Sequence, residues 1–170
     1  SAAPAVPVSS AQAIAALING QSGLSGIEAE TAINITSVTE AGGDGMSFNL
    51  NINDASGTQQ GIAVVLPTGA VTDTNVATAI SAALAAETSA NGTDFSNLQI
   101  SAADGGIKLV DSTGGNIQID ASGGANADVI SIQNYAADGT LVAGGPVNIT
   151  ANLAGSDTGT VVGYLKNDTA

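Results

Sequence analysis

The chain of 170 residues contains no cysteine, histidine, arginine or tryptophan. Without cysteine it forms neither a disulfide framework nor a thiolate nucleophile, and without histidine it lacks the usual general base. Aromatic residues make up only 2% of the chain, so a core must be built from small aliphatic side chains, and a sugar cleft with aromatic platforms is not expected. These absences predict that the protein is not an enzyme, has no catalytic, cofactor-binding or metal-ligating residues, and uses no cofactor.

Positive charge is also scarce. Lys108 and Lys166 are the only basic side chains, against 15 acidic residues, and the formal net charge is −13. Because such a chain cannot neutralise phosphate groups, nucleic acid is excluded as a partner, and an anionic membrane surface would repel it. The negative charge instead favours solubility and keeps copies of the chain apart.

Long apolar runs are missing as well. No stretch approaches the roughly 20 apolar residues that span a bilayer, and the opening SAAPAVPVSS lacks the basic region and apolar core of a secretion signal. We therefore expect a soluble segment of a longer protein. Its 44% hydrophobic residues suffice for a folded core.

Two segments have the pattern of short amphipathic helices. In the first, Ser9 and Gln12 form a capping box and Asn19-Gly20 ends the helix in a left-handed conformation; the expected buried face comprises Ile14, Leu17 and Ile18. In the second, Asp73 is the expected N-cap and the helix ends near Asn91-Gly92. Its expected buried face comprises Val76, Ile80, Ala83 and Leu84.

The remaining pattern is that of short strands. Residues 46–53, MSFNLNIN, alternate strictly between apolar and polar side chains, which predicts a half-buried antiparallel strand. The turn GGDG at 42–45 predicts a hairpin with a strand at 31–38, and DASGT leads into a third strand at 61–67. A small meander is expected at 97–101, 106–111 and 116–120, and three further strands at 128–135, 145–153 and 159–166.

The sequence therefore predicts an α+β fold of short antiparallel β-strands and hairpins, with the two helices packed on thin sheets. Four segments follow from this reading, with two subdomains as one arrangement of them. They are an extended lead-in at 1–8, a helix-plus-hairpin module at 9–67, a helix-plus-meander module at 68–122 and a β-rich closing segment at 123–170.

Three weak motifs have competing structural explanations. The GGDG turn, with Asn49, Asn51, Asn53 and Asp54, has the oxygen spacing of a calcium loop, but it stands alone, and a solvated strand with its turn explains it better. Asn-x-Ser/Thr triplets occur at Asn34, Asn91, Asn148 and Asn167, as expected by chance in this composition. The glycine-rich turns lack the basic residue of a phosphate loop.

The helix-turn-strand plan of residues 11–31, AQAIAALINGQSGLSGIEAET, returns at 76–94, VATAISAALAAETSANGTD. With LQISAADGGIKLVDSTGGNIQID at 98–120, these segments resemble the repeated Ile-Asn motif in the variable outer region of bacterial flagellins. The resemblance covers roughly residues 9–122. Ile18-Asn19 matches the motif directly, whereas the second copy has Ala85-Ala86 in that place. The heptad-patterned terminal helices of a whole flagellin are missing from this sequence.

The resemblance implies an extracellular, surface-exposed domain of a flagellar filament subunit. Its roles would be structural, in motility and antigenic variation, with adhesion as an accessory role, and its partners would be other flagellin subunits, host surfaces, antibodies or glycans. Specific contacts are expected in the loops at 137–145 and 154–159, and the termini are expected to lie close together. The alternatives are an outer domain of a hook-associated or filament cap protein, and a glycan- or calcium-binding module of a secreted bacterial adhesin.

Overall fold

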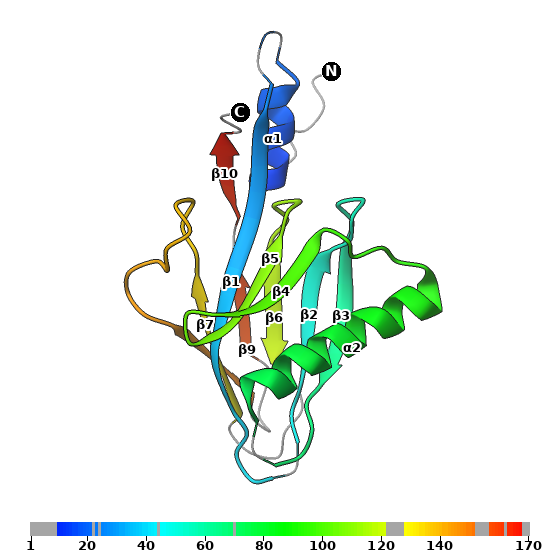
Figure 1. Cartoon of the computed structure of the whole chain (residues 1–170), viewed down its shortest axis with the longest axis vertical. Helices are drawn as coiled ribbons and strands as arrows, with labels where there is room; N and C mark the ends of the chain where they lie inside the picture. Colours follow the sequence, from blue (N-terminus) through cyan, green and yellow to red (C-terminus); the bar gives the residue numbers. More distant parts are fainter. Residues whose placement is uncertain are drawn as a thin grey trace.

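The computed structural model describes residues 10–21, 23, 25–43, 45–69, 71–121, 128–151, 157–161 and 163–167, and its elements are drawn in Figure 1. Two helices and two antiparallel sheets, one of six strands and one of four, confirm the α+β fold. The helices are α1 (Ala11–Asn19) and α2 (Asp73–Asn91). The strands are β1 (Ile27–Thr39), β2 (Ser47–Asn53), β3 (Gln59–Val65), β4 (Leu98–Ala103), β5 (Gly106–Asp111), β6 (Ile117–Ala121), β7 (Asp128–Asn134), β8 (Val147–Ala151), β9 (Asp157–Val161) and β10 (Tyr164–Asn167).

The two sheets share one core. The large sheet has the order β4-β5-β1-β7-β8, with β10 paired to the first residues of β1, and the small sheet has the order β3-β2-β6-β9. The prediction of a β1–β2 hairpin is therefore wrong, because the turn after β1 carries the chain from one sheet to the other. The β2–β3 hairpin is confirmed, with Ser47 opposite Val65 and Asn53 opposite Gln59.

The predicted meander is only half correct. β4 and β5 form a tight hairpin in which Ala103 pairs with Gly106. The third member, β6, lies instead in the small sheet between β2 and β9. The strand expected at 159–166 is also two strands, because β9 belongs to the small sheet and β10 pairs with β1.

Strand β2 contributes three fully buried side chains to the core. Its apolar side chains Phe48, Leu50 and Ile52 are all at most 1% exposed, as the strict alternation predicts. Together with Ile33 and Ile35 of β1 they belong to one cluster of buried residues. The core is thus made almost entirely of aliphatic side chains from both sheets.

Helix α2 covers this core on one side. Val76, Ile80 and Leu84 are buried, as expected, and the helix packs on β3 and reaches β4 and β5. Its N-cap is Thr72, whose side chain accepts from the backbone N–H of Asn75, so the expectation of Asp73 is wrong by one residue. Gly92 ends the helix at φ 71°, the left-handed conformation that glycine adopts most readily.

Helix α1 differs from its prediction in three ways. Its N-cap is Ser10 and not Ser9, and Gly20 ends it with φ −76° and not in the left-handed region. The buried face is Ala11 and Ala15, whereas Ile14 and Leu17 are 37% and 55% exposed and Ile18 is half-buried. The physical reason is close approach, because only small side chains let the helix lie against Ala29 of β1.

Helix α1, residues 27–30 of β1, and β10 together form a unit that we call the stalk, which projects beyond the two sheets at one end of the molecule (Figure 1). α1 and β10 both contact β1 and each other. The first and last described elements of the chain therefore lie side by side. The terminal residues, including the lead-in expected at 1–8, lie outside the described residues.

Strands from the three sequence segments interleave in this arrangement. The large sheet takes β1 from residues 9–67, β4 and β5 from 68–122, and β7, β8 and β10 from 123–170. The small sheet likewise takes strands from all three segments. Each segment thus contributes to both sheets.

Candidate functional site

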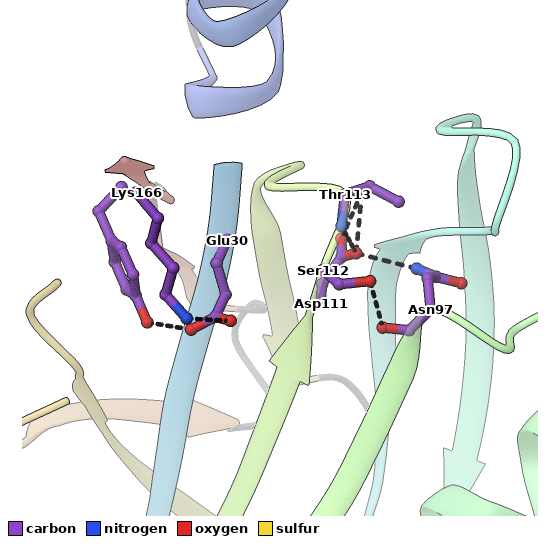
Figure 2. A network of polar contacts seen from close by, with 7 residues as sticks. Glu30, Asn97, Asp111, Ser112, Thr113 and Lys166 are labelled. Atoms are coloured by element: carbon purple, nitrogen blue, oxygen red, sulfur yellow. Dashed lines mark hydrogen bonds and ion pairs between the residues drawn. The ribbon is translucent and has the colours of Figure 1, made fainter. Parts of the chain in front are cut away.

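The junction between the stalk and the two sheets carries a network of polar contacts (Figure 2). Glu30 of β1 lies at its centre on the stalk side. The Lys166 ammonium donates to Glu30 Oε2 at 2.6 Å, and the Tyr164 hydroxyl donates to Oε1. Both donors come from β10, so this carboxylate ties β10 to β1.

Charge and burial act in opposite directions on this carboxylate. Partial burial alone would raise the pKa of Glu30, but the hydrogen bonds from Lys166 and Tyr164 and the lysine charge outweigh it, and the net pKa is lowered. For Tyr164, burial and then the bond to Glu30 raise the pKa of the hydroxyl. Glu30 is therefore ionised and Tyr164 protonated at neutral pH, which is the combination that this ion pair needs.

Asp111, the last residue of β5, is fully buried on the other side of the junction. Its Oδ1 accepts from Asn97 Nδ2 at 2.9 Å and from the Thr113 N–H and hydroxyl, both at 2.8 Å. Burial raises the pKa of the Asp111 carboxyl, and these hydrogen bonds offset only part of that cost. No described lysine contacts it, since Lys166 binds Glu30 and Lys108 lies over the Tyr135 ring.

This second network reaches helix α1. Asn97 Nδ2 also donates to the Asn53 carbonyl at 2.9 Å, and Asn53 Nδ2 donates to Gln12 Oε1 at 3.0 Å and to Thr113 Oγ1 at 3.2 Å. The backbone N–H of Gln12 donates to the Gly114 carbonyl at 3.1 Å. A chain of hydrogen bonds therefore runs from β5 and Asn97, the residue before β4, through the end of β2 to the first turn of α1.

Asn19, at the other end of α1, holds the beginning of β1. Its Nδ2 donates to the Ile27 carbonyl at 2.7 Å and its Oδ1 accepts from the Ile27 N–H at 3.1 Å. The side-chain amide thus pairs with the backbone as a neighbouring strand would. This is the Asn of the Ile18-Asn19 pair, and its contact explains why an amide is useful at the end of this helix.

A third polar cluster covers the outer face of β1. Asn34 is fully buried and donates from Nδ2 to the Tyr135 hydroxyl at 3.0 Å, and that hydroxyl donates to Asp104 Oδ2 at 2.5 Å. Lys108 lies 4.2 Å above the centroid of the Tyr135 ring, a cation–π contact. Burial raises the pKa of Tyr135, with a further contribution from Asp104. The cluster fixes the β4–β5 turn over β1.

The Asn-x-Ser/Thr triplets have different environments. Because Asn34 is buried, the folded chain offers no access to a glycan there. Asn91 and Asn148 are exposed, on α2 and β8, with side chains bonded to Glu87 and Ser131 respectively. The side chain of Asn167 lies outside the described residues.

The carboxylate oxygens of Asp54, in the candidate calcium loop, have structural partners. Asp54 Oδ1 accepts from the Ser56 N–H and hydroxyl and from the Thr58 N–H, which closes the β2–β3 turn. These bonds, led by the Ser56 hydroxyl, lower the pKa of Asp54. Asn51 donates to Asp120 at 2.9 Å. Asp44 of GGDG is outside the described residues, within which no three acidic side chains are placed to share a metal ion.

The loop expected to make contacts at 137–145 is exposed and forms one wall of a shallow groove of about 280 Å³ with the end of β7 and the beginning of β8. Gln133 Nε2 donates to the Val142 carbonyl at 2.8 Å and holds the loop against β7. No charged side chain lines the groove. Residues 154–156 of the second expected loop, at 154–159, lie outside the described residues, and residues 157–159 belong to strand β9 and not to a loop.

Sequence reasoning does not identify Glu30, Asn97 or Asp111 as residues of interest. For Asp111 a signal exists, because an Asp that ends a strand before Ser-Thr-Gly-Gly is typical of a side chain that caps its own turn. Glu30 has no comparable signal, since its partners lie more than 130 positions away in the sequence. Taken together, the hydrogen bonds of these junction residues join strands and a helix, although the buried Oδ1 of Asn97 has no partner among the described residues.

No family model, curated protein sequence or solved structure matches this chain. Neither helix within the described residues is long and apolar enough to cross a membrane.

Proposed function

We propose that this chain is the surface-exposed outer domain of a bacterial flagellin, with a structural role on the outside of the filament and no catalytic step. The observation that carries the proposal is the stalk. Because α1 and β10 lie side by side on β1, a longer polypeptide can enter and leave the domain at one end. That is the arrangement of a domain inserted into another body.

The sequence motif gives independent support. The Ala-rich helix, the Ile18-Asn19 pair and the strand that follows are the elements that resemble flagellins, and Asn19 binds the first residue of that strand. The motif thus corresponds to a physical unit, the helix–strand corner of the stalk.

Charge and composition also suit a densely displayed surface. Exposed carboxylates occur on separate elements and turns, namely Glu28, Asp73, Asp94, Asp104 and Asp138. With a net charge of −13, neighbouring domains on a filament would repel each other and stay apart. The absence of cysteine removes any risk of wrong disulfides during export in an unfolded state.

Immunogold electron microscopy tests this function. Antibodies raised against the 170-residue chain would be applied to intact cells of the source bacterium, with antiserum pre-absorbed on the same chain as the control. We expect gold along the whole length of the flagellar filaments. Gold on the cell body with bare filaments would contradict the proposal and favour an adhesin, and gold confined to the hook or filament tip would favour a hook-associated or cap protein.

A further inference from the structure

Helix α1 presents two of its three large apolar side chains, Ile14 and Leu17, outward, while the third, Ile18, is half-buried. Ile14 and Leu17 are 37% and 55% exposed, whereas the buried face consists of Ala11 and Ala15 packed on Ala29. An isolated amphipathic helix would bury its large side chains and expose the small ones. The inversion leaves an apolar face on the stalk on which Leu17 is about half exposed and Ile14 about one third exposed.

This face is also free of charge. Residues 11–19 contain no charged side chain, and the first charged residue of the chain is Glu28, although 15 acidic residues follow from there on. Charged residues are depleted at the centres of protein interfaces, because their desolvation is costly. The α1 face thus has the composition of an interface centre in a chain whose surface is otherwise acidic.

The face is held rigidly in place. Asn19 fixes the end of the helix to β1, and the backbone N–H of Gln12 is bonded to Gly114 at its beginning. A surface whose backbone is ordered in advance loses little conformational entropy when a partner binds.

The size of the face decides what can occupy it. A helix of nine residues is about 14 Å long and about 10 Å wide, so the face covers on the order of 150 Å². A stable complex between free proteins buries about 800 Å² on each partner. A free second copy therefore cannot be held by this face, and mutual charge repulsion opposes it further. A tethered partner can use so small a contact, because the covalent link raises its effective concentration.

We propose that the Ile14–Leu17 face of α1 docks against an uncharged, apolar surface of the same longer polypeptide, in the body that the chain joins next to α1 and β10. This inference rests on the proposed function, in which the domain is an insertion. The contact would fix the angle at which the domain leaves the filament. Without this contact, the two chain segments that connect the domain to the rest of the polypeptide would act as a hinge. The docked helix would restrict bending at this connection.

A unique thiol tests the docking. The chain has no cysteine, so Leu17→Cys introduces a single reactive group on the face, and Val65→Cys does the same on β3 at a site that is 71% exposed. Each variant would be prepared in the 170-residue chain and in the whole parent polypeptide. The rate of alkylation by a small maleimide would be followed by peptide mass spectrometry.

We expect the thiol of the Leu17→Cys variant to react at least about tenfold more slowly in the parent than in the isolated chain, as for a group that must be uncovered before it reacts. The thiol of the Val65→Cys variant should react at the same rate in both. Equal rates for the Leu17→Cys variant in parent and isolated chain would overturn the docking. Protection in the isolated chain that grows with its concentration would also overturn it, since that would identify a second copy as the occupant.

The two experiments also separate the docking from the function on which it rests. Gold-labelled filaments together with an unprotected thiol on the α1 face would leave the function standing and overturn the docking. Protection of that thiol without filament labelling would support a docked domain in a parent other than a flagellin.

Discussion

Asn19 and Ile27 are joined by a pair of hydrogen bonds, from the Asn19 side-chain amide to the backbone N–H and carbonyl of Ile27. The pair closes the loop between α1 and β1 and orients the stalk helix. It converts a short Ile-Asn sequence into a fixed helix–strand corner.

Replacement of Asn19 by alanine should therefore loosen this corner. Two exposed hydrogen bonds are lost, and we expect a decrease of about 1 kcal/mol in the free energy of unfolding, with faster amide exchange in α1. Asn91→Ala is the matched control, because Asn91 also ends a helix but bonds only to Glu87 within it. Urea denaturation and hydrogen exchange measure both effects, and equal exchange rates in α1 of the two variants would contradict this role.

The Glu30→Gln substitution should change how the free energy of unfolding depends on pH in the acid range. Because the folded-state pKa of Glu30 is lowered from its ordinary 4.5, its contribution is present above that value and is lost as the pH falls through the folded-state pKa. We expect the variant to be less stable by about 1 kcal/mol at pH 7 and to differ less from the natural chain at pH 3. Urea titrations at several pH values check this, and a constant difference from pH 7 to pH 3 would count against the ion pair.

The contribution of Asp111 to stability should depend on pH in the opposite direction to that of Glu30. Its folded-state pKa is raised above the ordinary 3.8, so its stabilising contribution is full below 3.8 and is lost as the pH rises through the folded-state pKa. An amide at this position can still accept from Asn97 and donate to Thr113. Asp111→Asn should thus be at least as stable as the natural chain at pH 7, with the difference vanishing in acid.

Asp111→Ala is the informative comparison. It leaves the Asn97 amide and the Thr113 N–H without their acceptor in a buried site, which should cost about 2 kcal/mol or more. Equilibrium unfolding in urea at pH 7 ranks the three proteins. If Asp111→Asn and Asp111→Ala lowered the free energy of unfolding equally, the charge of Asp111, and not its hydrogen bonds, would stabilise the junction.

Alanine substitutions at two glycines distinguish the cost of backbone strain from the cost of a steric clash. Gly105 and Gly114 have φ values of 75° and 73°, but an added Cβ meets nothing within 4 Å at Gly105, whereas at Gly114 it would lie 2.2 Å from Ala29 Cβ. Gly105→Ala should cost about 1 kcal/mol and Gly114→Ala about 3 kcal/mol or more. Thermal unfolding of both variants measures the difference, and similar melting temperatures would mean that β1 is not packed on this turn.

Local patterns predict the elements better than their pairing. The alternation of β2 and the face of α2 are correct predictions, because in both a single side is buried against the core. The turn at 42–45 does not form the predicted hairpin but connects the two sheets. Its glycines are compatible both with a hairpin within one sheet and with a connection to the other sheet. Only packing of the complete chain decides between these.

The α1 face and the junction network lie beyond sequence reasoning for a related reason. Whether Leu17 or Ala15 faces inward depends on the gap between α1 and β1, and that gap is set by Ala29 and Leu165. Asp111 and Asn97 are 14 residues apart and meet only when β4 and β5 are in register. Long-range contacts of this kind leave no local periodicity to detect.

A cryo-electron microscopy map of the flagellar filaments proposed to contain this chain would show directly where the domain lies. We expect the two-sheet body at the outer radius, with α1 and β10 pointing toward the filament axis and the Ile14–Leu17 face covered by density of the same subunit. A filament surface into which the two sheets cannot be placed, or a placement with the stalk pointing outward, would contradict the account.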